Sequence, residues 1–423
     1  MPPIIEALIG QAKAAERAGR AAEAEAMWQE IAARAPAHPR VLLRRANQLL
    51  EGRDARAALD LLAPAAAADK TDPEIRLSQA LAHRLLGDSA NALAALDAAL
   101  AIEPYNFLAL LSKGAVLERL GHPRIAAMAY RDALKIAPPA ETLPAGVQAG
   151  VARAKAMIAA NAEALAAFLR QRTADLAARS AGEDLTRFEE CLAIYAGTKK
   201  TYVHEPLLLN FPKLPAFTFY ERSYFPWLAK LEAATDIFRA ELELVLKADW
   251  ERFRPYIQYA PGTPVNQWVA LNHSPAWSTF FLWKNGTRNE ENCQRCPRSA
   301  AALEGLSMAH IPEFSPTAMF SVLQPRTTIP AHTGSTNARL ICHLPLILPS
   351  NCRFRVGNDT REWKMGEAFV FDDSIEHEAW NDSDEVRVVL IFDVWNPLLT
   401  QAERDLVSAL LIARKEFDAG DLA

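Results

Sequence analysis

The sequence predicts a protein of two parts, an α-helical repeat array followed by a β-rich domain with flanking helices. The first 140 residues are rich in alanine and leucine, and their glycines and prolines recur at steps of about 34 residues. From Thr201 onward, aromatic residues cluster and short runs rich in Val, Ile and Phe are separated by turn signals. The chain has 423 residues, half of them hydrophobic, so it can bury the cores of two or three domains.

The punctuation of the first part is regular. Gly19, Gly52, Gly87 and Gly121 follow one another at steps of 33, 35 and 34 residues, and small residues such as Gly114 recur at matching places. Small residues let two helices approach closely, glycine closes the turn between them, and proline ends the second helix. A plain helical bundle would not keep this grid. Residues 1–140 resemble a tetratricopeptide repeat array of about four units, which implies a concave surface for an extended peptide or partner protein.

The rest of the chain divides into a helical connector, expected over residues 141–200, and a second domain over residues 201–423. A helix is expected near residues 228–246 and another over residues 400–417. Between them, β-type runs occupy residues 317–325, 338–349, 352–358, 367–373 and 386–395. Their spacing predicts an antiparallel sandwich or barrel.

Charge and cysteine content exclude several classes of protein. The net charge is −5 and the chain has no dense Lys/Arg run, so a nucleic-acid partner is not indicated. No apolar run reaches the roughly 18 residues of a membrane helix, and the N-terminus does not read as a secretory signal. Five cysteines are few and odd in number for this length, which favours reduced thiols in the cytoplasm.

Polar residues occur inside the β region where a simple core would not place them. His332 precedes a strand, His343 lies inside ARLICHLPLIL, His377 follows FDDSIE, and Arg387 opens VRVVLIFDVW. Any one of these histidines alone is more readily structural than a ligand, but three with an arginine on consecutive strands point to a site. Imidazole suits iron, zinc or copper, and arginine can make a two-point contact with a carboxylate.

Two segments carry a resemblance to a known family. HTGSTNARLICHL and FDDSIEHEAWNDSDEVRVVLIFDVWNP closely resemble the aspartyl/asparaginyl β-hydroxylase family, and the similarity extends upstream through WSTFFLWKNGTRNEENC and SVLQP. It covers roughly residues 215 to 400. The resemblance implies a double-stranded β-helix fold and an oxygenase that uses iron(II), the cosubstrate 2-oxoglutarate and O2.

The resemblance also implies roles for particular residues. The two iron ligands fall on His332 and His377. The contacts to the tail carboxylate of 2-oxoglutarate fall on Arg387 with help from Ser321, and a second cosubstrate contact falls on His343.

Trp277 and Arg339 match positions that line the pocket toward the substrate. One position departs from the family's animal members, which have an arginine where this chain has Ile341. That arginine helps to bind acidic groups, so the substitution leaves the substrate open.

The position of a third metal ligand is occupied by Gly334. Most oxygenases of this kind use two histidines and a carboxylate, whereas a two-histidine centre is typical of this family. Asp372 and Asp373 either supply contacts that orient the metal ligands or form a solvated turn or β-bulge.

Three weaker features are interpreted structurally. Cys293 and Cys296 form a CxxC without a second metal-binding pair, so a loop role is expected rather than zinc binding or redox activity. Phe280 and Trp283 are expected in the core, and Arg326 is expected to face solvent.

The leading functional hypothesis is hydroxylation of the β-carbon of Asp or Asn in a peptide or protein, which the repeats would present. Hydroxylation of a free amino acid or a lipid acyl chain is the alternative, and a long apolar groove would favour the acyl chain. A non-catalytic repeat adaptor is the third hypothesis, which the intact His332, His377 and Arg387 disfavour.

Overall fold

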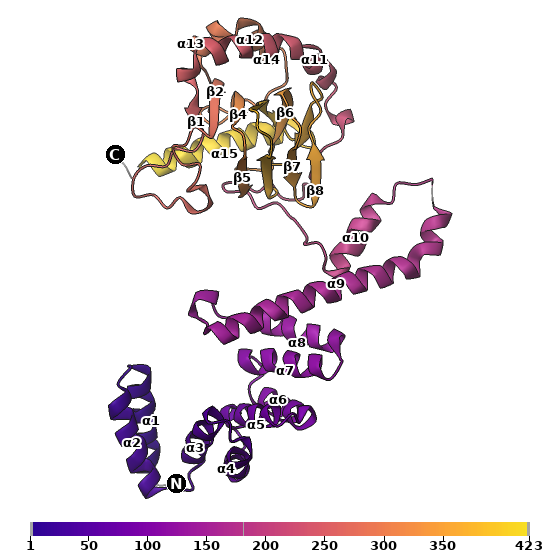
Figure 1. Cartoon of the computed structure of the whole chain (residues 1–423). Coiled ribbons are helices and arrows are strands. Elements are labelled where there is room, and N and C mark those ends of the chain that lie inside the picture. Colours follow the sequence, from indigo (N-terminus) through magenta and orange to yellow (C-terminus); the bar gives the residue numbers. More distant parts are fainter. Residues whose placement is uncertain (1–2, 181, 421–423) are drawn as a thin grey trace. The chain divides into compact units, whose positions relative to one another are not determined.

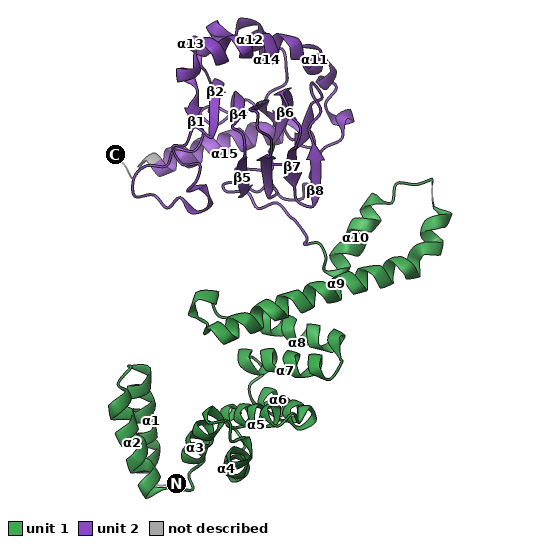
Figure 2. Ribbon diagram, in the orientation of Figure 1, with its two compact units in different colours: residues 1–199 green, residues 200–423 purple. Residues whose placement is uncertain are grey.

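The computed structural model describes residues 3–180 and 182–420 and divides into two compact units, residues 1–199 and 200–423 (Figures 1 and 2). The predicted fold class is confirmed, since helices alone build the first unit and antiparallel sheets with flanking helices build the second. In the described residues, no helix is long and apolar enough to cross a membrane.

The first unit is a succession of helix pairs followed by a long helix (Figure 1). The pairs are α1 (Pro3–Arg17) with α2 (Ala21–Arg34), α3 (Pro39–Glu51) with α4 (Ala55–Ala68), α5 (Pro73–Leu85) with α6 (Ser89–Ile102), and α7 (Phe107–Arg119) with α8 (Pro123–Lys135). After them come α9 (Ala145–Arg179) and α10 (Thr186–Ala196), so the predicted connector is helical and packs within this unit.

The repeat punctuation has the expected physical causes. Gly87 and Gly121 close the turns inside their pairs with φ of 77° and 78°, which side chains disfavour. Gly114 on α7 lies against Tyr130 on α8, and a Cβ there would come within 2.4 Å of the tyrosine ring. The small residue is therefore required for close helix packing.

The second unit contains two antiparallel sheets. The larger has the order β1-β2-β4-β11-β6-β9, with β3 beside β2, and the smaller has the order β5-β10-β7-β8. The strands are β1 (Arg254–Pro255), β2 (Trp277–Lys284), β3 (Thr287–Arg288), β4 (Ala318–Leu323), β5 (Thr327–His332), β6 (Arg339–Ile347), β7 (Cys352–Val356), β8 (Asp359–Glu362), β9 (Phe369–Phe371), β10 (His377–Asn381) and β11 (Arg387–Trp395).

Helices cover one face of the larger sheet (Figure 1). They are α11 (Leu228–Ala233), α12 (Thr235–Ala248), α13 (Glu290–Arg295) and α14 (Pro297–Glu304), and α15 (Gln401–Gly420) is the last described element. Short 3-10 helices span Ala140–Thr142, Arg222–Tyr224, Trp250–Arg252 and Asn266–Trp268.

Alternation along the central strands decides which residues can form a site. On β11, Val388, Leu390 and Phe392 enter the core beneath the helices. The intervening residues, from Arg387 to Asp393, point the other way because successive side chains of a strand face opposite sides. Both faces of the large sheet are buried, which explains why its strands are almost continuously apolar.

Candidate metal and cosubstrate site

A cavity of about 290 Å³ lies where the two sheets face each other. Its lining includes residues of β2, β4, β6 and β11 from the larger sheet and of β5, β7 and β10 from the smaller. The structure brings all seven predicted site residues to this cavity: Ser321, His343, Arg387, Trp277, Arg339, His332 and His377. Their individual roles remain predictions.

The two proposed metal ligands form a close pair. His332 ends β5 and His377 begins β10, and the two residues are direct partners across these strands. Their ring centroids are 4.0 Å apart. His332 Nδ1 lies 2.7 Å from the carbonyl oxygen of Pro330, and His377 Nδ1 lies 3.0 Å from that of Ile375. Each carbonyl accepts a hydrogen bond from Nδ1–H, which leaves both Nε2 lone pairs free to bind a metal.

The environment keeps these imidazoles neutral, as metal binding requires. Burial lowers the pKa of His332 to about 4, although the hydrogen bond to Pro330 opposes the shift. Burial, and next the neighbouring His332, lower the pKa of His377 well below its usual value. The residues present therefore fit a divalent metal with nitrogen ligands.

The space beside Gly334 is filled by a carboxylate from another segment. A Cβ at Gly334 would lie 1.9 Å from Asp373 Oδ2, and the Gly334 N–H donates to the Asp373 carbonyl at 2.5 Å. Asp373 Oδ1 is buried and has no hydrogen-bond partner. Gly334 is thus the residue that admits the Asp373 carboxylate to this part of the site.

In residues 3–180 and 182–420, no group of three or more His, Cys, Asp or Glu side chains is arranged to hold a metal ion. In the described residues, no third His, Cys, Asp or Glu side chain therefore forms such a group with the histidine pair. Asp373 stands close by, with a pKa that burial raises to about 7 against the attraction of Arg339.

Asp372 and Asp373 are both buried, so the interpretation of a solvated turn is wrong. Asp372 Oδ1 accepts hydrogen bonds from Ser374 N at 2.9 Å and Ser374 Oγ at 2.6 Å, while its Oδ2 lies 3.2 Å from His204 Nε2. These contacts fix the turn that leads into His377.

Arg387 lines the cavity without an acidic partner among the described residues. It is almost completely buried, its guanidinium carbon lies 4.9 Å from the centre of the Trp363 ring, and its Nε has no hydrogen-bond partner. No Asp or Glu pairs with it in the part of the chain that the structure describes. Burial lowers its pKa to about 10. An unpaired buried charge costs several kcal/mol, so this arrangement fits an anionic ligand.

The other two predicted cosubstrate contacts lie on neighbouring strands. Ser321 Oγ on β4 accepts a hydrogen bond from Trp277 Nε1 at 3.0 Å, so the tryptophan orients the serine. His343 on β6 is packed among aromatic rings, and its Nδ1 has no partner. Burial, reinforced by the charge of Arg387, lowers the pKa of His343 well below its usual value.

Arg339 has a different environment from Arg387. Its Nη1 lies 2.9 Å from Asp393 Oδ2 and its Nη2 lies 3.4 Å from Asp373 Oδ2. Burial disfavours the charge, but the two carboxylates outweigh it and raise the pKa of Arg339. Its direct contacts in this structure are to acids of the chain, so it positions Asp373.

Much of the remaining wall is apolar and was missed by the sequence interpretation. Tyr256, Ile257 and Trp268 come from the irregular segment before β2, and the Trp268 ring lies 4.9 Å from that of His332. Ile341 adds an aliphatic surface between Arg339 and His343 on β6. The clustering of aromatics in the sequence was the only signal for these contacts.

The weaker features resolve as follows. Cys293 lies in α13 and Cys296 directly follows it, so the expected loop role is wrong. Both thiols are buried, and burial raises their pKa values to about 11 and about 12, which keeps them protonated. Phe280 and Trp283 are in the core as predicted. Arg326 is exposed as predicted, and it pairs with Asp384.

Comparisons with known proteins show similarity to hydroxylases. The family profile described as aspartyl/asparaginyl beta-hydroxylase matches residues 232–397. The ornithine lipid ester-linked acyl 2-hydroxylase of Rhizobium tropici is 36% identical over 233 residues, which cover 54% of this chain and 76% of that protein. The aspartyl/asparaginyl beta-hydroxylase of Mus musculus is 34% identical over 197 residues, covering 44% of this chain but 25% of the mouse protein.

Solved structures match the chain only partially. A structure of MamA from Desulfovibrio magneticus RS-1 is 19% identical and covers 31% of this chain and 75% of its own, with a TM-score of 0.26. The first TPR domain of human RPAP3 is 20% identical and covers 30% of this chain and 95% of its own, also with a TM-score of 0.26.

The segment matched by the family profile contains both histidines, Arg387 and the strands that hold them. With most of the Rhizobium hydroxylase also covered at 36% identity, the chain belongs to the aspartyl/asparaginyl β-hydroxylase family.

Proposed function

We propose that the second unit is an oxygenase that requires iron(II) and 2-oxoglutarate and hydroxylates an unactivated carbon. The observation that carries the proposal is the buried, unpaired Arg387 in the same cavity as two neutral histidines. An anionic cosubstrate would satisfy the arginine, and a metal would satisfy the two free Nε2 atoms.

The chain's own groups divide the work. His332 and His377 would hold the metal, and Arg387 with Ser321 would bind the tail carboxylate of the cosubstrate. Asp373 would accept a hydrogen bond near the metal, because its Oδ1 is buried and unpartnered. The apolar wall keeps bulk water away from the reacting carbon.

Iron(II) with O2 would supply the oxidant that turns a C–H bond into C–OH. In the overall reaction, 2-oxoglutarate, O2 and R–H give succinate, CO2 and R–OH. One oxygen atom enters succinate and the other enters the product. The protein aligns the target carbon and excludes water.

The charges of the cavity separate two of the candidate substrate classes. The β-carbon of Asp or Asn in a peptide is one candidate, in line with the family's description. An aliphatic carbon of a lipid acyl chain is the other, in line with the acyl 2-hydroxylase activity for which the Rhizobium relative is named. With Arg387 assigned to the cosubstrate and Arg339 paired with two acids, the cavity offers no uncommitted arginine for a substrate carboxylate. Ile341 adds an aliphatic surface to the same cavity. The cavity lining therefore favours an acyl carbon over the side chain of an Asp residue.

The helical unit is proposed to bind a partner. A polar groove of about 370 Å³ between its first helices is lined by Trp28, Arg40 and Arg44, among others.

All five cysteines of the chain are free, which supports the proposed cytoplasmic location.

The test of the proposed activity is direct. Anaerobic protein with iron(II) and 2-oxoglutarate should develop a visible charge-transfer band, and admission of O2 should yield succinate. His377→Ala should lose both signals because one metal ligand is gone. His310→Ala, at an exposed histidine outside the cavity, is the matched control and should keep both. A wild type without the band, or a His377→Ala variant that retains it, would refute the proposed centre.

A further inference from the structure

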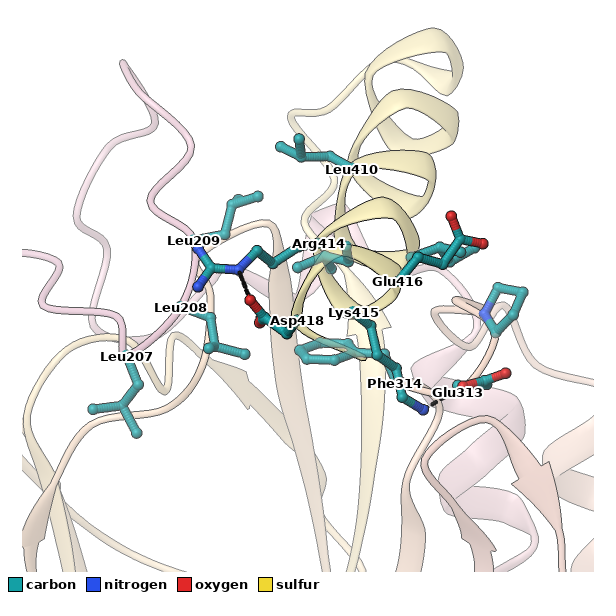
Figure 3. A pocket seen from close by; sticks show the side chains of 13 residues that line it. Leu207, Leu208, Leu209, Glu313, Phe314, Leu410, Arg414, Lys415, Glu416 and Asp418 are labelled. Atoms are coloured by element: carbon teal, nitrogen blue, oxygen red, sulfur yellow. Dashed lines mark hydrogen bonds and ion pairs between the residues drawn. The ribbon is translucent and has the colours of Figure 1, made fainter. Parts of the chain in front are cut away.

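A second, larger hollow adjoins the cavity in the same unit. A groove of about 760 Å³ lies between residues 207–209, residues 312–314 and helix α15 (Figure 3). Its lining is mainly leucine, isoleucine and phenylalanine side chains. We refer to it as the α15 groove.

One wall of the α15 groove is fixed to the metal site. Backbone N–H groups of Leu207 and Leu208 donate to the carbonyls of Gly334 and Ser335 at 2.9 and 3.0 Å. Leu207 lines both the α15 groove and the cavity that holds the histidine pair. The groove and the cavity therefore meet at a shared wall residue, Leu207, next to the glycine that lies two residues beyond His332.

The apolar lining is exposed to a degree that needs an explanation. The relative solvent exposure of the residues Leu207, Leu208 and Leu410 is 73%, 66% and 57%. Contiguous exposed apolar surface on a folded domain marks an interaction site or a ligand groove. Three separate chain segments form the surface, so its exposure does not depend on the conformation of a single loop.

The charges at the rim do not call for a charged occupant. Arg414 pairs with Asp418 at 2.9 Å, and Lys415 pairs with Glu313 (Figure 3). Both cations of the groove are thus committed to acids of the chain. The occupant that fits this surface is an apolar chain rather than an acidic peptide.

We propose that the α15 groove binds the aliphatic tail of an acyl-chain substrate whose carbon close to the polar end lies at the histidine pair. The inference rests on the proposed function for the position of the reacting carbon. A tail that passes Leu207 would run from the cavity into the groove. A second copy of the protein docked on α15 would not require the groove and the cavity to meet.

The test measures chain-length dependence of binding. Butanoyl-, octanoyl- and dodecanoylglycine are titrated calorimetrically, below their micelle concentrations, into the full chain loaded with zinc and 2-oxoglutarate. Burial of each additional methylene should tighten binding by about fourfold until the groove is filled. Affinity that does not change with chain length would overturn the proposal.

Two groove variants and one matched control locate the tail. Leu410→Glu on α15 and Leu208→Glu on the opposite wall should each weaken dodecanoylglycine binding by roughly tenfold or more, because a charge enters an apolar groove. Leu406→Glu, on the same helix and similarly exposed at 69% but outside the groove, should bind like the wild type. Equal effects of all three variants would overturn the proposal.

Other outcomes separate the competing occupants and the two levels of inference. A dimer in sedimentation that Leu410→Glu dissociates, with acylglycine affinity unchanged, would assign the groove to a second copy. A wild type that produces no succinate from 2-oxoglutarate would refute the proposed activity. Chain-length-dependent binding that the groove variants abolish would still stand in that case.

Discussion

The two buried arginines of the cavity lie at opposite ends of the paired strands β11 and β6, and they differ in whether an acidic side chain pairs with them. Arg387 begins β11 and has no acidic partner in the described chain, whereas Arg339 is the strand partner of Trp395 at the other end and is paired with Asp393 and Asp373. Burial lowers the pKa of Arg387, while the carboxylates raise that of Arg339. A buried charge that the chain neutralises supports the fold, whereas a buried charge without a partner is available to an anionic ligand.

The largest expected effect on stability comes from removing Asp393, the acidic partner of Arg339. Asp393 accepts hydrogen bonds from Ser315 Oγ at 2.9 Å and Thr317 N at 2.6 Å besides pairing with Arg339. Asp393→Ala should therefore destabilise the second unit by about 3–5 kcal/mol, because it strands a buried charge. Urea unfolding followed by tryptophan fluorescence reports on this unit, since Trp28 is the one tryptophan of nine outside it.

The matched control removes an exposed pair. Asp384→Ala deletes the partner of Arg326 at the surface and should change stability by less than about 1 kcal/mol. Equal effects of the two substitutions would show that burial of the Arg339 pair does not matter.

Substitution of the unpaired Arg387 should have the opposite effect, with stability kept and ligand affinity lost. Arg387→Met keeps the side-chain length and removes a charge that nothing in the described chain neutralises, so the fold should lose no stability. The affinity for 2-oxoglutarate should fall by roughly a hundredfold or more, because a desolvated charge pair is lost. Calorimetry on the zinc-loaded protein measures the affinity, and parallel urea unfolding measures the stability. A destabilised variant with unchanged affinity would reverse the comparison.

A smaller effect tests the packing that brings Asp373 toward Arg339. Gly334→Ala places a methyl group 1.9 Å from Asp373 Oδ2 and should cost about 1–3 kcal/mol through overpacking. In an Asp373→Ala background the same substitution should cost almost nothing, since the obstructing carboxylate is absent. Additive costs in the double variant would mean that the two residues do not meet.

The smallest effect concerns pH. Burial raises the pKa of Asp373 to about 7, above its usual value of 3.8, so between these values the unfolded chain releases a proton that the folded chain keeps. Stability of the metal-free protein therefore falls as the pH rises through this window. Between pH 5.5 and 6.5, the wild type should lose about 1 kcal/mol relative to Asp373→Asn. A difference that is constant with pH would place the Asp373 pKa outside the window.

The sequence was sufficient for features that depend on local period. The 34-residue grid predicts the helix pairs, and apolar runs predict the strands β4, β6, β7, β9 and β11. Polar residues inside such runs, His343 and Arg387, are conspicuous because both faces of the large sheet are otherwise apolar.

Features that depend on distant contacts escaped prediction. Asp393 meets Ser315 across 78 residues, and Leu207 meets Gly334 from a segment without regular structure. No local pattern encodes such pairs. Asp393 did carry a signal, however, because it lies an even number of residues from Arg387 on one strand and must share its face.

The central claim is that Arg387 recognises the tail carboxylate of 2-oxoglutarate. The most direct measurement compares calorimetric binding of 2-oxoglutarate with 2-oxopentanoate, in which a methyl group replaces that carboxylate, to zinc-loaded wild type and Arg387→Met. The wild type should prefer 2-oxoglutarate by roughly a hundredfold or more, and the variant should lose that preference. A preference that survives in Arg387→Met would contradict the claim.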